Sequence, residues 1–334
     1  MLRSVLALLA FITICLQSCT VVPSNDQSKV TVQTIGYEKL FNQDNTITPQ
    51  FQHLFKLLKT PQVPENLEQA FNLVQGKYDQ GYTWLRQGER YHTQSDAWLT
   101  EEQADAVIEF CKVIGFFSDI PTPSNINGIL VMGSTLERMR AQVKTLNHSI
   151  EENPILGKLP VYFIGGERML SKEIGETQQN LYHPDNASVI LKKGYRVQQN
   201  PPEINDERDM IALVANQSLS DQFQHVVFVM APKKESAVRA TTMDGMKLWF
   251  TKHNPPSGHY ALVSSNPFIL YQQLVATDAA LIFNRPDIHF SGYGTAINSA
   301  YYITQKGKTN VARILLDNFA RIIYEIRQIQ QHLE

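Results

Sequence analysis

The feature that most constrains the fold is the alternation of short apolar runs with longer amphipathic segments in the second half of the chain. Five runs have the length and apolarity of buried strands, at residues 128–132, 159–164, 225–230, 260–263 and 280–283. Helical patterns separate or follow them, at about residues 136–147, 206–218, 237–252, 267–277 and 311–333. This alternation is typical of β-α-β crossovers, which build a mostly parallel sheet with helices on both faces. The sequence therefore predicts a doubly wound α/β domain over about residues 125–334.

The preceding part of the chain has a helical pattern instead. Apolar residues recur every three or four positions between about residues 37 and 117, and Thr100 and Gln103 have the spacing of a capping box. The turn-rich stretch DIPTPSNING, residues 119–128, ends this pattern. We expect a helical N-terminal region over residues 37–120, packed on the α/β domain. Cys111 lies in an apolar part of it and is predicted to be a buried core residue rather than a nucleophile.

The N-terminus has the pattern of an export signal. Arg3 precedes an apolar run at residues 5–14 that is too short for a permanent membrane span, so residues 1–18 are predicted to be a signal peptide. The sequence LQSC, ending at Cys19, resembles the bacterial lipobox, which implies that the thiol of Cys19 carries a lipid. An ordinary secretory peptide is the alternative. Residues 19–36 are predicted to be a flexible tether, and because no Asp follows Cys19, the lipobox favours the periplasmic face of the outer membrane.

Several classes of function have no support in the sequence. The formal net charge is −2 and no basic run occurs, which argues against nucleic acid as a partner. Nine histidines without a metalloprotease spacing, and no cysteine pair, argue against a metal site. A Gly-x-Ser-x-Gly elbow is missing, and SGYGT at residues 291–295 is predicted to be a glycine turn. His259 and His289 are predicted to be surface or hydrogen-bonded side chains.

A ligand site is predicted where the strands end. Ligands of open parallel sheets bind outside the carboxyl ends of the strands. Glycine there lets a backbone approach a ligand, and helix N-termini suit phosphate or carboxylate groups. The small polar residues at these ends are Gly133, Ser134, Gly165, Gly166, Ser264 and Ser265. Neither a P-loop nor a three-glycine dinucleotide pattern is present, so the cofactor stays unknown.

Two further features accompany this predicted site. Arg138 and Arg140 follow the first strand by one or two helical turns, where they either bind an anion or form a solvated helix face. The segment 173–205 fits neither a strand nor a helix, and we interpret it as an excursion over the pocket.

The order of these segments resembles a bacterial envelope family of unknown function, the SanA/YdcF/ElyC-like proteins. The corresponding segments, between residues 128 and 277, are ILVMGSTLERMRAQVKTL, VYFIGGERM, NDERDMIALV, RATTMDGMKLWF and ALVSSNPFILYQ. The resemblance implies a Rossmann-like fold, and a nucleotide-like ligand such as S-adenosylmethionine is associated with one branch of the family. By position, it implies pocket residues at Gly133, Arg138 or Arg140, Gly165, Gly166, Glu207, Thr242, Asp244, Ser264 and Ser265.

The chain also departs from the family pattern. Asp244 replaces a Glu, Gly245 replaces an Asn, and Phe268 and Tyr271 stand where the family commonly has His and Arg. Two functions therefore remain: an envelope lipoprotein that binds a small anionic, phosphorylated or nucleotide-like ligand in cell-envelope or wall metabolism, or a non-catalytic envelope scaffold. A glycosidase is a weaker alternative, because Glu207 near a helix start equally suits the helix dipole. Catalytic residues, and whether the protein is an enzyme, stay open.

Overall fold

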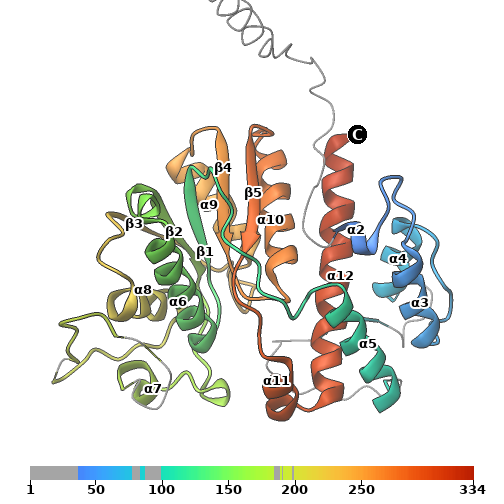
Figure 1. Ribbon diagram of the computed structural model, residues 1–334, viewed down its shortest axis with the longest axis horizontal. Coiled ribbons are helices and arrows are strands. Elements are labelled where there is room, and N and C mark those ends of the chain that lie inside the picture. Colours follow the sequence, from blue (N-terminus) through green and yellow to red (C-terminus); the bar gives the residue numbers. More distant parts are fainter. Residues whose placement is uncertain (1–36, 77–82, 87–98, 184–188, 190, 198) are drawn as a thin grey trace, which may run out of the picture. The chain divides into compact units, whose positions relative to one another are not determined.

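The structure is a computed structural model that describes residues 37–76, 83–86, 99–183, 189, 191–197 and 199–334 (Figure 1). The described residues all belong to one compact unit. The predicted signal peptide, the lipidation site Cys19 and the tether lie outside them. Among the described residues, no helix combines the length and the apolarity that crossing a membrane requires.

Five parallel strands form one sheet, as predicted for a doubly wound, Rossmann-like α/β fold. They are β1 (Gly128–Met132), β2 (Pro160–Gly166), β3 (His225–Ala231), β4 (Gly258–Val263) and β5 (Ile288–Tyr293). Their order across the sheet is β3-β2-β1-β4-β5. The central strand β1 pairs with two neighbours, so that Ile129 lies opposite Val161 of β2 and Ala261 of β4. The strand order therefore reverses direction between β1 and β4.

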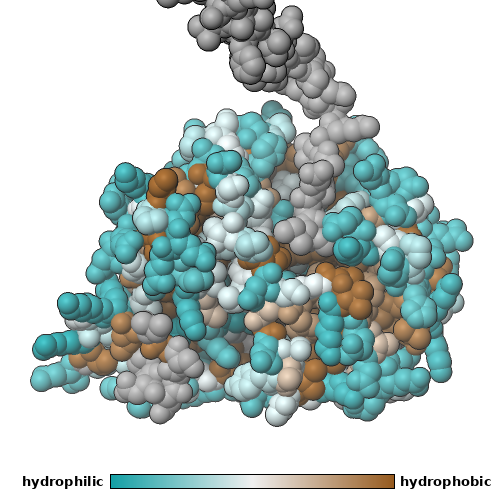
Figure 2. Space-filling model, viewed as in Figure 1, coloured by the Kyte–Doolittle hydropathy of each residue, from teal (hydrophilic) through white to brown (hydrophobic). Residues whose placement is uncertain are grey.

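Helices cover both faces of the sheet and bury β1 completely. On one face, α6 (Leu136–Glu152) and α8 (Glu207–Ser218) pack on Ile129 and Val131. On the other, α9 (Thr242–His253) and α10 (Ile269–Ile282) pack on Leu130 and Met132. Successive side chains of a strand point to opposite faces of the sheet, so the apolar residues of β1 contribute to the hydrophobic cores on both faces. The outer surface over α6 is mainly hydrophilic (Figure 2).

The predicted fifth strand is wrong. Residues 280–283 belong to the end of α10 and the residue that caps it, and the strand follows as β5. A short apolar run looks alike in a buried strand and a buried helix, and α10 is apolar all round because it packs on β5, α9 and α12. The predicted glycine turn at Ser291 lies largely within β5, where a Cβ atom on Gly292 would come 2.3 Å from Ile269. Gly292 thus permits close packing of α10 on the strand.

The N-terminal helices pack against the last helix of the chain, which lies between them and α10 (Figure 1). These elements are α2 (Tyr37–Leu40), α3 (Pro49–Leu57), α4 (Leu67–Val74), α5 (Glu101–Val113) and α12 (Lys308–Leu333). Aromatic rings form the contact: Phe319 of α12 lies 5.5 Å from Phe51 and 5.3 Å from Phe116, between ring centroids. The predicted capping box at Thr100 and the burial of Cys111 are confirmed.

The remaining short elements lie in the connections. They are the 3-10 turns η1 (Pro154–Lys158) and η2 (Lys172–Ile174) and the helices α7 (Gln178–Tyr182) and α11 (Ser299–Lys306). The last of these, α11, follows β5 and contacts α12.

Two carboxylates are buried between α10 and α12. Asp278 is 4 % exposed and Glu325 is 7 % exposed. Burial, reinforced by the charge of Asp278, raises the pKa of Glu325 to about 8, and burial also raises the pKa of Asp278. His332 Nε2 lies 3.3 Å from Asp278 Oδ1 and opposes the shift of Asp278. The interface therefore favours a protonated Glu325 at neutral pH.

We predict that Glu325→Gln stabilises the protein at alkaline pH. Because the folded-state pKa of Glu325 lies above its unfolded value, its contribution to stability is complete at acid pH and is lost as the pH rises through about 8. The neutral amide removes this loss, so the free energy of unfolding at pH 9 should rise by about 5 kcal/mol, with little change at pH 5. Urea denaturation of the variant and the wild type at the two pH values measures this difference in the free energy of unfolding. Glu109→Gln, on the surface of α5, is the control, and an equal gain at both pH values would contradict the prediction.

Candidate functional site

A cavity of about 700 Å³ lies at the carboxyl edge of the sheet, where the residues that follow β1, β2 and β4 meet. It spans the place where the strand order reverses, which is where ligands bind in doubly wound folds. All the predicted ligand-binding residues except Asp244 line it: Gly133, Ser134, Arg138, Gly165, Gly166, Glu207, Thr242, Ser264 and Ser265. The structure thus brings together residues that lie up to 132 positions apart in the sequence.

Two residues implied by the family resemblance do not reach the cavity. Asp244 is the third residue of α9 and closes its capping box, since its Oδ2 accepts a hydrogen bond of 2.9 Å from the Thr241 amide. Arg140 Nη2 donates to the Asn180 carbonyl oxygen at 2.6 Å, which ties α6 to α7. Of the two arginines considered for the site, Arg138 is the one at the cavity wall.

The glycines at the strand ends permit close packing of the chain on itself. A Cβ atom on Gly133 would lie 2.7 Å from Glu207 Oε1, and one on Gly166 would lie 2.7 Å from the Ala240 Cβ. At Gly165 the nearest atom would be Ile211 Cδ1, at 2.5 Å. Protein atoms thus occupy the space that side chains at these three positions would need, while the glycines themselves line the cavity.

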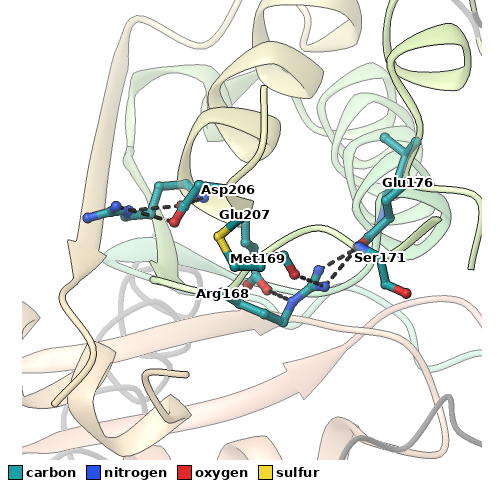
Figure 3. Close-up of polar contacts among 8 residues, drawn as sticks. Arg168, Met169, Ser171, Glu176, Asp206 and Glu207 are labelled. Atoms are coloured by element: carbon teal, nitrogen blue, oxygen red, sulfur yellow. Dashed lines mark hydrogen bonds and ion pairs between the residues drawn. The ribbon is translucent and has the colours of Figure 1, made fainter. Parts of the chain in front are cut away.

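A buried arginine connects three segments at the floor of the cavity (Figure 3). Arg168, just after β2, donates from Nε to Glu207 Oε2 at 2.5 Å, where α8 begins. Its Nη1 and Nη2 atoms donate to the two carboxylate oxygens of Glu176 at 2.8 Å and 2.7 Å. The Glu176 side chain is fully buried. The bidentate geometry and the burial make this a fixed part of the site.

The carboxylate of Glu176 occupies the N-terminus of α6. The N-cap residue Thr135 makes no side-chain cap there, and the Leu136 amide donates to Glu176 Oε1 at 3.2 Å. The Ser171 amide donates to Oε2 at 2.8 Å. A helix N-terminus favours an anion, and here that anion belongs to the protein. The first amide of this helix is therefore taken by a carboxylate of the protein.

The charges of the network follow from its burial and its pairing. Burial alone would lower the pKa of Arg168, but its hydrogen bonds to Glu176 and the charges of Glu207 and Glu176 outweigh burial and raise the pKa above its usual value. Burial raises the pKa of Glu207, although the Arg168 charge opposes this. Arg168 is thus a permanent cation, while Glu207 is an easier carboxylate to protonate than an exposed one.

The opposite wall of the cavity is aromatic and cationic. The Arg138 guanidinium carbon lies 4.4 Å from the centre of the Phe268 ring, and its Nη2 lies 3.4 Å from the Tyr302 hydroxyl. Tyr271 also lines this wall, and α11 adds Tyr301 and Lys306. Phe268 and Tyr271 therefore form part of the wall and leave the cavity open. Of the described residues of the predicted excursion 173–205, Glu173 and Ile174 line the cavity.

Sequence reasoning missed Arg168, Glu176 and α11. Arg168 follows β2 in the string GGERM, and this position after a strand was the available signal. His259 lies on β4, where its Nε2 is 2.7 Å from Ser291 Oγ on β5, in agreement with the hydrogen-bonded role predicted for it. Within the described ranges, no group of three or more His, Cys, Asp or Glu side chains could hold a metal ion.

The comparisons with known proteins add no relative. No family model matches the chain, and neither the curated proteins nor the solved structures include a significant match. The fold assignment therefore rests on the strand order and helix packing described above. The resemblance to the SanA/YdcF/ElyC-like family rests on the order of segments and stays a prediction.

We predict that Arg168→Gln destabilises the protein by about 3–5 kcal/mol at pH 7. The substitution leaves Glu207 and Glu176 buried without their cation, and breaking one side of a buried ion pair has a cost of this size. The loss should shrink at pH 4, because protonation removes the unpaired charges. Urea denaturation measures both values.

Arg208→Gln is the matched control for this substitution. Arg208 pairs with Asp206 on the surface of the same helix start, where its side chain is 38 % exposed. Its loss should change the free energy of unfolding by no more than about 1 kcal/mol. Similar losses for the two variants would contradict the proposed role of Arg168.

Proposed function

We propose that this protein is a membrane-anchored envelope lipoprotein whose Rossmann-like domain binds a small anionic or nucleotide-like ligand, in cell-envelope or wall metabolism. The observation that carries the proposal is the cavity at the carboxyl edge of the sheet, lined by residues at the ends of β1 and β2 and just after β4. Its volume of about 700 Å³ lies within the usual range for small-molecule sites.

The charge of the lining favours an anionic ligand. Five cationic side chains, Arg138, Arg168, Arg239, Lys306 and Arg321, face three acidic ones, Glu137, Glu173 and Glu207. Arg168 is engaged by carboxylates, and Arg321 donates to Asp317 at 2.9 Å. Arg138 stacks on a ring and pairs with no carboxylate of the described residues, which makes it the best-placed cation for the ligand.

The envelope location and the family membership are proposed on the sequence. The signal pattern and the lipobox-like LQSC support a lipid anchor at Cys19, and the segment order supports a divergent member of the SanA/YdcF/ElyC-like family. The competing function, a non-catalytic scaffold, would be favoured by a site plugged with Phe268 and Tyr271, but both residues line an open cavity.

We predict that a phosphorylated or nucleotide-like ligand raises the melting temperature of the protein. A ligand at about one hundred times its Kd adds about 2.7 kcal/mol to the free energy of unfolding. Thermal shift against nucleotides, S-adenosylmethionine, sugar phosphates and polyprenyl phosphates measures it. Arg138→Gln should abolish the shift, whereas Lys144→Gln, exposed on the same helix, should retain it. A protein that responds to no member of this panel would contradict the proposal.

We predict that Cys19→Ala releases the protein from the membrane. Without the thiol the lipid cannot be attached, so cells fed a labelled palmitate analogue should yield labelled wild type and unlabelled variant. Cell fractionation should find the wild type with membranes and the variant in the soluble fraction. Cys15→Ala, within the predicted signal, is the control and should stay labelled. Labelling that persists in Cys19→Ala would refute the anchor.

A further inference from the structure

The two oxygens of the Glu207 carboxylate have different surroundings. Oε2 accepts from Arg168 Nε, whereas Oε1 lies against Gly133, and no residue of the described ranges donates a hydrogen bond to it. Glu207 is only 7 % exposed, and it lines the cavity. Because no described residue donates to Oε1, its hydrogen bond has to come from water or from a ligand in the cavity. Oε1 is therefore a position where a ligand donor would be bound.

Two serines line the same cavity at the end of β4. Ser264 and Ser265 follow β4, the neighbour of β1, and are 3 % and 4 % exposed. Their backbone atoms are engaged, since the Ser264 amide donates to the Tyr293 carbonyl and the Ser265 carbonyl accepts from the Phe268 amide. Neither hydroxyl has a partner among the side chains that the structure describes. A carboxylate acceptor and two hydroxyls on one cavity suit a ligand whose groups both donate and accept, as sugar hydroxyls do.

A phosphate does not fit at this part of the floor. The carboxylate of Glu176 takes the first amide of α6, and both it and the Glu207 carboxylate would repel an anion placed beside them. The cations without a described carboxylate partner are at the other wall: Arg138 on Phe268, and Lys306 at the end of α11. The cavity thus separates a site for hydroxyl groups from a site for an anion.

We infer that the cavity takes a sugar with two neighbouring hydroxyls and one terminal phosphate, with the diol at Glu207, Ser264 and Ser265 and the phosphate at Arg138 and Lys306. A nucleoside monophosphate and a simple sugar phosphate share this chemistry. The inference rests on the proposed function and adds the ligand class and its orientation.

Calorimetric titration of the full chain with a matched ligand series tests the orientation. The probes are AMP, its 2′,3′-dideoxy analogue, adenosine, ribose 5-phosphate and inorganic phosphate. AMP should bind the wild type at least about tenfold more tightly than the dideoxy analogue, the equivalent of one good hydrogen bond to a charged group. Ribose 5-phosphate decides whether the base contributes, and inorganic phosphate alone should bind weakly.

Substitutions test which side chains bind each end of the ligand. Glu207→Gln should lower the affinity for AMP about tenfold and leave the affinity for the dideoxy analogue unchanged. Lys306→Gln should lower the affinity for both compounds and leave the affinity for adenosine unchanged. Asp209→Asn, exposed on α8, is the control for Glu207. If Glu207→Gln fails to fold, Ser264→Ala, which changes no charge, should still reduce the preference for the diol.

The outcomes separate the inference from the proposed function. Equal affinity for AMP and the dideoxy analogue, or inorganic phosphate that binds as tightly as AMP, would overturn the assigned orientation while leaving an anion-binding site. A wild type that binds none of the five probes, nor any other phosphorylated compound, would overturn the proposed function itself.

Discussion

The pairing of one buried guanidinium with two carboxylates fixes the geometry on which the site depends. Arg168 extends from the end of β2 and holds Glu207 at the start of α8 and Glu176 in the segment after η2. Glu176 in turn binds the first amide of α6. Separating any of these segments would leave a charge buried without a partner, at a cost of several kcal/mol. The floor of the cavity is thus preorganised by the protein's own charges.

This network explains why the strand ends are rich in glycine. The ends of β1 and β2 lie so close to α8 and to the start of α9 that side chains at Gly133 and Gly166 would collide with Glu207 and Ala240. Gly133 thus leaves room for Glu207 of the arginine network, and Gly166 leaves room for the segment that leads into α9. The same small residues that resemble a ligand-approach motif in the sequence are therefore required by packing, and the ligand-facing groups are the side chains beside them.

The sequence predicted the parts of the fold in which local pattern and burial agree. β1 to β4 are short apolar runs bounded by turn residues, and a central parallel sheet needs such runs. β5 was not predicted, because it is an edge strand in which His289 and Ser291 alternate with apolar residues. The end of α10 was predicted as a strand instead, because it is as apolar as a buried strand. Local periodicity cannot separate these two cases.

The sequence was enough to predict where the site lies, but only part of its chemistry. The rule that ligands bind at strand ends selected Gly133, Gly166 and Ser264, because it depends on topology alone. It could not reveal Glu176, which lies eight residues beyond Arg168 in a segment without periodicity and acts through a contact that only folding creates. That contact changes the interpretation of the site, because a carboxylate of the protein already takes the first amide of α6. For the proposed ligand, the remaining candidates for recognition are the unpaired oxygen of Glu207 and the cations of the opposite wall.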